Sequence, residues 1–171
     1  FTPDERLEFI VGLGEALYVD ESSGAAAAIF ESALASRSEM AVTARERILD
    51  WWATALDRDA QSRSDIERQA VYQRVRERMR EELATNLAST TGLYWAAAAA
   101  RGQGDLQGAW DAAQAGWVRA ALAPDGGRTL RDDLDRLVQR ALIPERARIL
   151  ARPPDVLSAE WEQFKAKWQE N

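Results

Sequence analysis

The side chains that most often carry out catalysis are missing from this chain. Its 171 residues include no His and no Cys, which excludes an imidazole base, a thiolate nucleophile and the usual zinc ligands. The only Lys residues, Lys165 and Lys167, stand in no Ser-x-x-Lys arrangement that could activate a hydroxyl. Carboxylate chemistry remains, but no set of carboxylates forms a catalytic constellation. The sequence therefore predicts a protein that is not an enzyme and uses no cofactor.

Two motifs that resemble ligand sites have simpler explanations. Asp132, Asp133 and Asp135 fall near an expected helix N-terminus, where carboxylates complement the helix dipole without a metal. The glycine pairs at 12–14 and 102–104 resemble pieces of phosphate-binding loops, but neither follows a strand. We therefore expect no metal site and no phosphate loop.

Charge and hydropathy limit the partners. A formal net charge of −6 and a pI near 4.9 disfavour nucleic acid, because affinity for phosphates comes mainly from Lys and Arg. No apolar run approaches the roughly 20 residues that span a bilayer. We expect a soluble protein, either exported after removal of a targeting segment or cytoplasmic, because the chain starts at Phe1. The compartment and the oligomeric state stay open.

The elements expected to position any site are helices. Apolar residues recur at spacings of three and four, and no alternating run of β-branched residues occurs. We predict an all-α single domain over 1–171, with about eight helices. These form hairpins at about 3–37, 39–88 and 92–122, followed by C-terminal helices at 129–142 and 155–170. Pro144 is expected to stop the first of these two or to open a short extra turn.

The first and fourth helices carry specific expectations. The first has Thr2 as N-cap and Pro3 in its first turn. Its expected core stripe consists of Leu7, Ile10, Leu13 and Leu17. The fourth helix mixes basic and acidic side chains, which is typical of a solvated face. These charged residues are Arg74, Arg76, Glu77, Arg78, Arg80, Glu81 and Glu82.

Small residues at two hairpins place helix backbones close together. In the first hairpin, Leu13-Gly14 is followed by Ala26, Phe30 and Ala33; in the late one, Ala97 and Gly104-Asp105 precede Ala109. This pattern resembles the tetratricopeptide repeat. The middle segment departs from it, because Trp52 stands where a small residue is usual. The resemblance implies an irregular right-handed solenoid of antiparallel hairpins with a C-terminal capping helix.

The resemblance also implies a function, a non-catalytic scaffold that binds a protein or peptide. In such repeats the first helix of each hairpin lines a concave groove. Carried onto this chain, the groove positions are Glu8, Val11, Glu15, Tyr18, Thr91, Tyr94, Ala98 and Arg101. Their carboxylates and lack of Lys predict a neutral or basic segment as ligand. Two alternatives stay open: a helical accessory domain that binds a carbohydrate or small molecule, and a structural oligomerisation module.

The seven Trp residues are expected mainly in the core, where Trp51, Trp110 and Trp117 fall in apolar stripes. The C-terminal stripe is ambiguous. Its residues Leu157, Trp161, Phe164 and Trp168 are spaced four, three and four, which gives one aromatic face. This helix either caps the last repeat, or Trp161, Phe164 and Trp168 form a partner face.

Overall fold

The structure is a computed structural model that describes residues 2–35 and 40–169, and these residues form helices and turns with no strand. The α-helices are α1 Pro3–Val19, α2 Ser23–Ala35, α3 Val42–Gln61, α4 Asp65–Thr85, α5 Thr90–Gly102, α6 Leu106–Arg119, α7 Arg128–Leu137, α8 Ile143–Leu150 and α9 Pro154–Gln169. A short 3₁₀ segment, η1 Ala120–Leu122, extends α6, and a π segment, η2 Val138–Leu142, joins α7 to α8.

The number and type of helices agree with the prediction. Because α7, η2 and α8 run without a break, the described residues contain eight helical rods. Pro144 lies in the first turn of α8, where its missing N–H is tolerated, so it opens this extra segment as expected. The predicted helix ends at 37, 39 and 170 lie outside the described residues.

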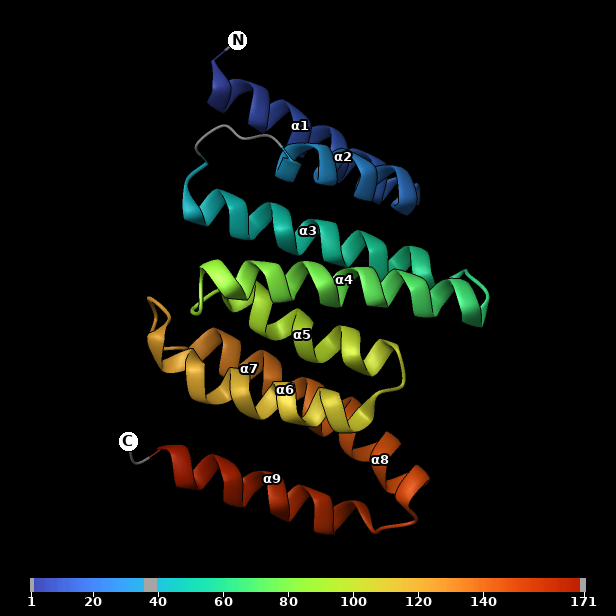
Figure 1. The fold of residues 1–171 in the computed structure, drawn as a ribbon, viewed down its shortest axis with the longest axis vertical. Helices are drawn as coiled ribbons and strands as arrows, with labels where there is room; N and C mark the ends of the chain where they lie inside the picture. The colour runs from blue at the N-terminus through green and yellow to red at the C-terminus, as the bar shows by residue number, and fades with distance from the viewer. Residues whose placement is uncertain (1, 36–39, 170–171) are drawn as a thin grey trace. The chain divides into compact units, whose positions relative to one another are not determined.

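Contacts along the chain divide it into two compact units, Phe1–Val75 and Arg76–Asn171, and the boundary falls inside α4. The first unit contains α1, α2 and α3, which follow one another as antiparallel neighbours (Figure 1). In the second unit, α5 and α6 form the most extensively packed helix pair, and α7, η2, α8 and α9 pack around it. The single domain and the right-handed solenoid stay predictions.

The core of the first unit is built around Gly14 and Phe30. Gly14 is buried, and a Cβ atom placed on it would lie 2.5 Å from Cζ of Phe30. Trp51 stacks on the Phe30 ring, with centroids 5.7 Å apart. Phe30, rather than Ala26, therefore fills the space beside Gly14, and the close crossing of Gly14 with Ala26 stays a prediction.

The predicted positions of Leu13 and Val11 on α1 are wrong, because the structure exposes the first and buries the second. Leu13 was expected in the core but is 41% exposed, whereas the predicted groove residue Val11 is buried at 4%. The reason is the orientation of Gly14. Each helical residue turns the side chain by about 100°, so Val11 shares the inward side with Gly14 and Leu13 points away.

The core of the second unit combines alanines with large aromatic rings. Ala97, Ala109 and Ala113 are fully buried between α5 and α6. The Trp161 ring of α9 lies edge-on to both Trp110 and Trp117 of α6, with centroids 5.7 and 5.6 Å away. Small residues thus let α5 and α6 approach closely, and indole rings close the unit beside α9.

Candidate binding surfaces

The outward side of α1 carries an apolar stripe that no other described element covers. Phe9 is 66% exposed and Val19 77%, and Leu13 lies between them. Gly12 and Ala16 are also exposed, and a Cβ placed on Gly12 would meet nothing within 4 Å. We call Phe9, Gly12, Leu13, Ala16 and Val19 the outer stripe of α1. Exposed apolar residues gathered on one helix face make the outer stripe a candidate binding surface.

Carboxylates surround this stripe. The segment from Thr2 to Glu21 has only Arg6 as a basic residue, and its acidic residues are Asp4, Glu5, Glu8, Glu15, Asp20 and Glu21. Glu5 is fixed in a capping box, in which its Oε2 accepts from the Thr2 amide at 2.8 Å. This confirms Thr2 as the N-cap. The field over the outer stripe is therefore negative.

The groove residues predicted on α1 lie in different surroundings. Glu8 is exposed. Glu15 accepts from Arg47 of α3 at 2.8 Å, and Tyr18 lies edge-on to Trp51 with a centroid distance of 5.3 Å. With Val11 buried, Glu8 is the one member of this set that is exposed. The role of Glu8, Glu15 and Tyr18 in binding stays a prediction.

The groove residues predicted on α5 belong to the second unit and are described by themselves. Thr91, Tyr94 and Ala98 are half-buried, and the Tyr94 ring lies edge-on to Trp95 at 5.4 Å. Arg101 donates to Glu145 of α8, with 2.6 Å between Nη2 and Oε1. These contacts tie α5 into its own unit, and a role for the four residues in ligand binding stays a prediction.

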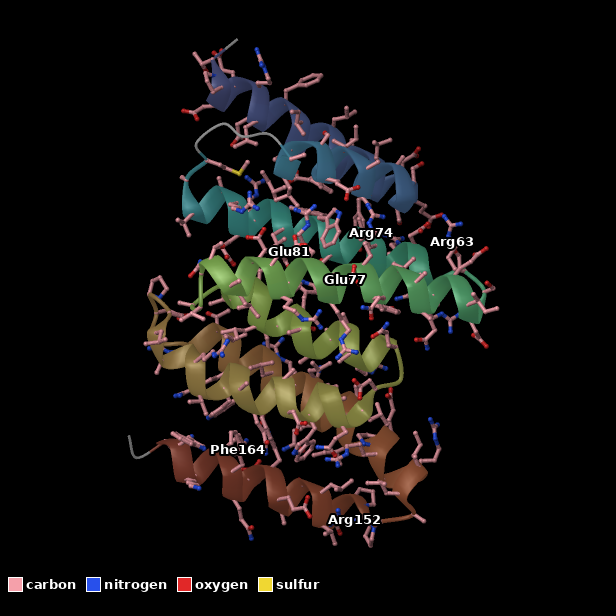
Figure 2. The ribbon with its side chains drawn as sticks, viewed as in Figure 1. Arg63, Arg74, Glu77, Glu81, Arg152 and Phe164 are labelled. Carbon is pink, nitrogen blue, oxygen red and sulfur yellow. The ribbon has the colours of Figure 1, made fainter. Side chains whose placement is uncertain are left out.

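The predicted partner face on α9 is wrong at Trp161, the first of its three residues. Trp161 is 0% exposed and lies within the core of the second unit. Phe164, labelled in Figure 2, stacks on Trp161 at 5.5 Å, and Trp168 also packs against the core. The aromatic stripe therefore faces inward and α9 covers the core, as the prediction of a C-terminal capping helix expected.

Polar contacts hold α9 onto α7 beside these rings. Oδ1 of Asp135 accepts from Trp161 Nε1 at 2.9 Å and from Lys165 Nζ at 2.7 Å. Partial burial alone would raise the pKa of Asp135, but these hydrogen bonds and the Lys165 charge outweigh it and hold the pKa below its ordinary value. Asp135 thus has a structural role, and the described residues contain no cluster that could hold a metal.

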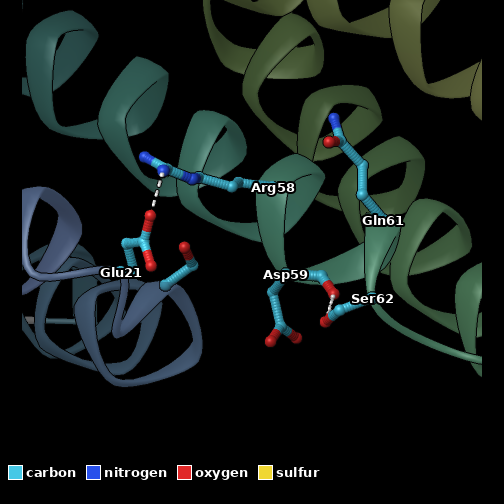
Figure 3. A pocket seen from close by; sticks show the side chains of 6 residues that line it. Glu21, Arg58, Asp59, Gln61 and Ser62 are labelled. Atoms are coloured by element: carbon cyan, nitrogen blue, oxygen red, sulfur yellow. Dashed lines mark hydrogen bonds and ion pairs between the residues drawn. The ribbon is translucent and has the colours of Figure 1, made fainter.

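A polar hollow of about 360 Å³ lies beside the turn between α1 and α2 (Figure 3). Its lining residues are Glu21, Ser23, Arg58, Asp59, Gln61 and Ser62. Glu21 lies 3.7 Å from Arg58, and the Asp59 carboxylate accepts from Arg63 at 3.2 Å. Because both carboxylates already have a cationic neighbour, this hollow shows no unpaired charge that would select a ligand.

The outer stripe of α1 was not predicted from the sequence, although its spacing gives a signal. Phe9, Leu13 and Ala16 are spaced four and three, as are the inward residues Leu7, Val11 and Gly14. A helix with two such stripes is apolar on two sides. Only one side can face α2, so the other needs a separate explanation.

Comparisons with protein-family models, curated proteins and solved structures find no match to this chain. Within the part of the chain that the structure describes, no helix combines the length and apolar character that a membrane crossing requires. A functional assignment therefore depends on the surfaces described above.

Proposed function

We propose that this protein is a non-catalytic scaffold whose outer stripe on α1 binds a basic amphipathic helix of a partner protein. The observation that carries the proposal is the exposure of Phe9 and Leu13 one turn apart on a helix surrounded by carboxylates. Bulky apolar anchors at a spacing of four residues suit helix-on-helix recognition. The resemblance of the first hairpin to tetratricopeptide repeats, which commonly bind proteins, supports the same role.

The exposed sides of α1 and α9 differ in a way that favours this surface. A helix side that faces water is usually polar. In the second unit, the exposed residues of α9 include Glu160, Glu162, Gln163 and Lys167. In the first unit, α1 exposes Phe9 and Leu13 instead. Covering such side chains contributes about 1.5–3 kcal/mol each when burial is complete.

Charge decides which occupant fits. A second copy that docked its own α1 here would bring two sets of carboxylates together, and like charges across an interface oppose association. A segment with Lys or Arg beside its apolar stripe would place cations near Glu8 and Asp20, which are both exposed. The occupant we propose is therefore a basic segment of another protein.

The small residues of the outer stripe favour a helix as the occupant. Gly12 and Ala16 lie one turn apart, and the space above Gly12 is open. Small residues let two helix backbones approach closely, and larger side chains on either side then interdigitate. Phe9 and Leu13 flank this crossing point on the same face of α1.

A synthetic peptide tests the proposal. The probe is an amphipathic helix of about 18 residues made of Leu and Lys, because shorter isolated helices are marginal in water. Its isomer with the same composition but scattered Leu residues measures charge attraction alone. By fluorescence anisotropy, we expect the amphipathic peptide to bind about tenfold or more tightly than the isomer.

Paired variants locate the binding surface. Phe9→Ala with Leu13→Ala removes both anchors and is expected to weaken binding about tenfold or more. The matched control is Val42→Ala with Ile66→Ala, which truncates two exposed apolar residues of the same unit outside α1. Equal binding of both peptides, or equal loss in both double variants, would reject the proposed surface.

A further inference from the structure

The second unit contains a hollow that combines two arginines with an apolar floor. Its volume is about 200 Å³, and Arg76, Arg80, Leu83, Ala96 and Ala112 line it. The first three residues lie along one side of α4, and the two alanines come from α5 and α6. The two alanines leave open space at the bottom of the hollow, because an alanine side chain ends at Cβ.

Arg76 is held in place at this hollow. Its side chain donates to Oε1 of Gln103 at 2.7 Å and lies 3.2 Å from Oδ2 of Asp105, at the turn between α5 and α6. Asp105 is itself fixed as the N-cap of α6, because its Oδ1 accepts from the Gly108 amide at 2.9 Å. The position of one guanidinium group is therefore set before any ligand arrives.

Arg80 lies one turn further along α4 and makes no hydrogen bond or ion pair with any residue that the structure describes. The neighbouring acidic residues Glu77 and Glu81 are exposed (Figure 2). Successive residues of a helix are about 100° apart, so Glu81 projects about 100° away from Arg80 around α4. Glu77, three residues before Arg80, is its neighbour on the helix surface, about 60° away.

We propose that this hollow binds a small organic monocarboxylate with a short apolar chain. Arg80 supplies the unpaired cation, and Arg76 supplies further N–H groups at a fixed position, which suits a planar carboxylate. Leu83, Ala96 and Ala112 provide the apolar contact for the chain of the ligand. An inorganic anion would leave this floor uncovered.

The volume sets the size of the ligand. Sites for drug-sized molecules usually occupy about 300–1,000 Å³, so this hollow suits a smaller compound. Pentanoate, which carries a four-carbon apolar chain next to its carboxylate, is a compound of this smaller class and is the probe we choose.

Chemical-shift titration of the full chain tests the site. Pentanoate is expected to shift the amide signals of Ala96 and Ala112 in a saturable way, and pentanol and acetate at the same concentrations are expected to give at least tenfold weaker binding. Pentanol lacks the charge, and acetate lacks the apolar chain. If pentanol matched pentanoate, the arginines would have no role and the inference would be overturned.

Three variants complete the test. Arg80→Gln removes the unpaired cation and is expected to weaken pentanoate binding at least tenfold. Ala112→Leu fills the hollow from α6 and is expected to abolish the saturable shifts of the Ala96 signal. Arg119→Gln removes an exposed cation of α6 that does not line the hollow, and binding should stay within twofold. Binding that Arg80→Gln leaves unchanged would also overturn the inference.

Discussion

The Phe30 ring occupies the space that a Cβ atom on Gly14 would need, with its Cζ 2.5 Å from that position. The ring cannot move aside easily, because Phe30 is fully buried and stacked on Trp51. This relationship sets the rotation of α1 about its own axis. It brings Val11 inward and turns Phe9 and Leu13 outward, so the packing of one glycine determines which face of α1 is available.

The first prediction concerns this glycine. Gly14→Leu should overpack the contact with Phe30 and lower the free energy of unfolding by about 1–3 kcal/mol. Gly12→Ala is the matched control on the same helix. Its Cβ would meet nothing within 4 Å, so replacing glycine inside a helix should stabilise by about 0.4–1 kcal/mol. Urea unfolding measures both changes, and equal effects would contradict the proposed orientation of α1.

The second prediction separates folding from binding on the outer stripe. Phe9→Ala with Leu13→Ala should change the free energy of unfolding by no more than about 1 kcal/mol, because exposed side chains contribute little to the core. Both residues are well exposed, and alanine favours the helix. A loss as large as that expected for Gly14→Leu would mean that these side chains support the fold.

Much of the fold could be predicted from the sequence because local signals agree with it. The capping box at Thr2 and the N-cap at Asp105 mark helix starts, and the apolar spacing marks the helices between them. The rotation of α1 was harder to predict. Leu13 and Val11 are both apolar, and only the tertiary contact between Gly14 and Phe30 decides which of them faces the core.

The candidate surfaces were predicted less well for a related reason. Spacing placed Trp161 on an aromatic face of α9 but did not show what that face contacts; Trp110 and Trp117 bury it. Likewise, the sequence showed alternating charges on α4 but not that Arg76 is held by Gln103. Each of these contacts joins segments that are distant in sequence.

The third prediction concerns Asp135, which links α7 to α9. Asp135→Ala leaves Lys165 and Trp161 Nε1 without this acceptor and should lower the free energy of unfolding at pH 7 by about 1–3 kcal/mol. Asp132→Ala, at an exposed position of the same helix, should change it by less than about 0.5 kcal/mol. Equal losses of unfolding free energy in the two variants would contradict a structural role for Asp135.

The pH dependence of the Asp135 contribution has a defined sign. Its pKa is held below its ordinary value in the folded protein, so the stabilisation is present above the unfolded pKa and is lost as the pH falls through the folded one. The difference in unfolding free energy between the parent and Asp135→Ala should therefore shrink when urea unfolding is measured at a pH well below the ordinary pKa of an aspartate. A difference that stayed constant would contradict this linkage.

The fourth prediction concerns the turn before α7. Gly127 has a φ of +84°, and a Cβ placed there would lie 2.2 Å from the carbonyl oxygen of Ala120. Gly127→Ala should therefore add a backbone clash to the cost of a left-handed conformation, which is itself about 1–2 kcal/mol. Gly126→Ala is the control, because its φ is +71° and its Cβ would have open space. Thermal unfolding should show the larger loss for Gly127→Ala.

The measurement that tests the proposed function most directly is a reversal of charge beside the outer stripe. Glu8→Lys with Asp20→Lys keeps Phe9 and Leu13 and inverts the nearby field. By fluorescence anisotropy at low salt, this variant should bind the Leu–Lys peptide about tenfold less tightly than the parent and should gain affinity for the corresponding Leu–Glu peptide. If both peptides bound the variant as they bind the parent, the outer stripe of α1 would not be the binding surface.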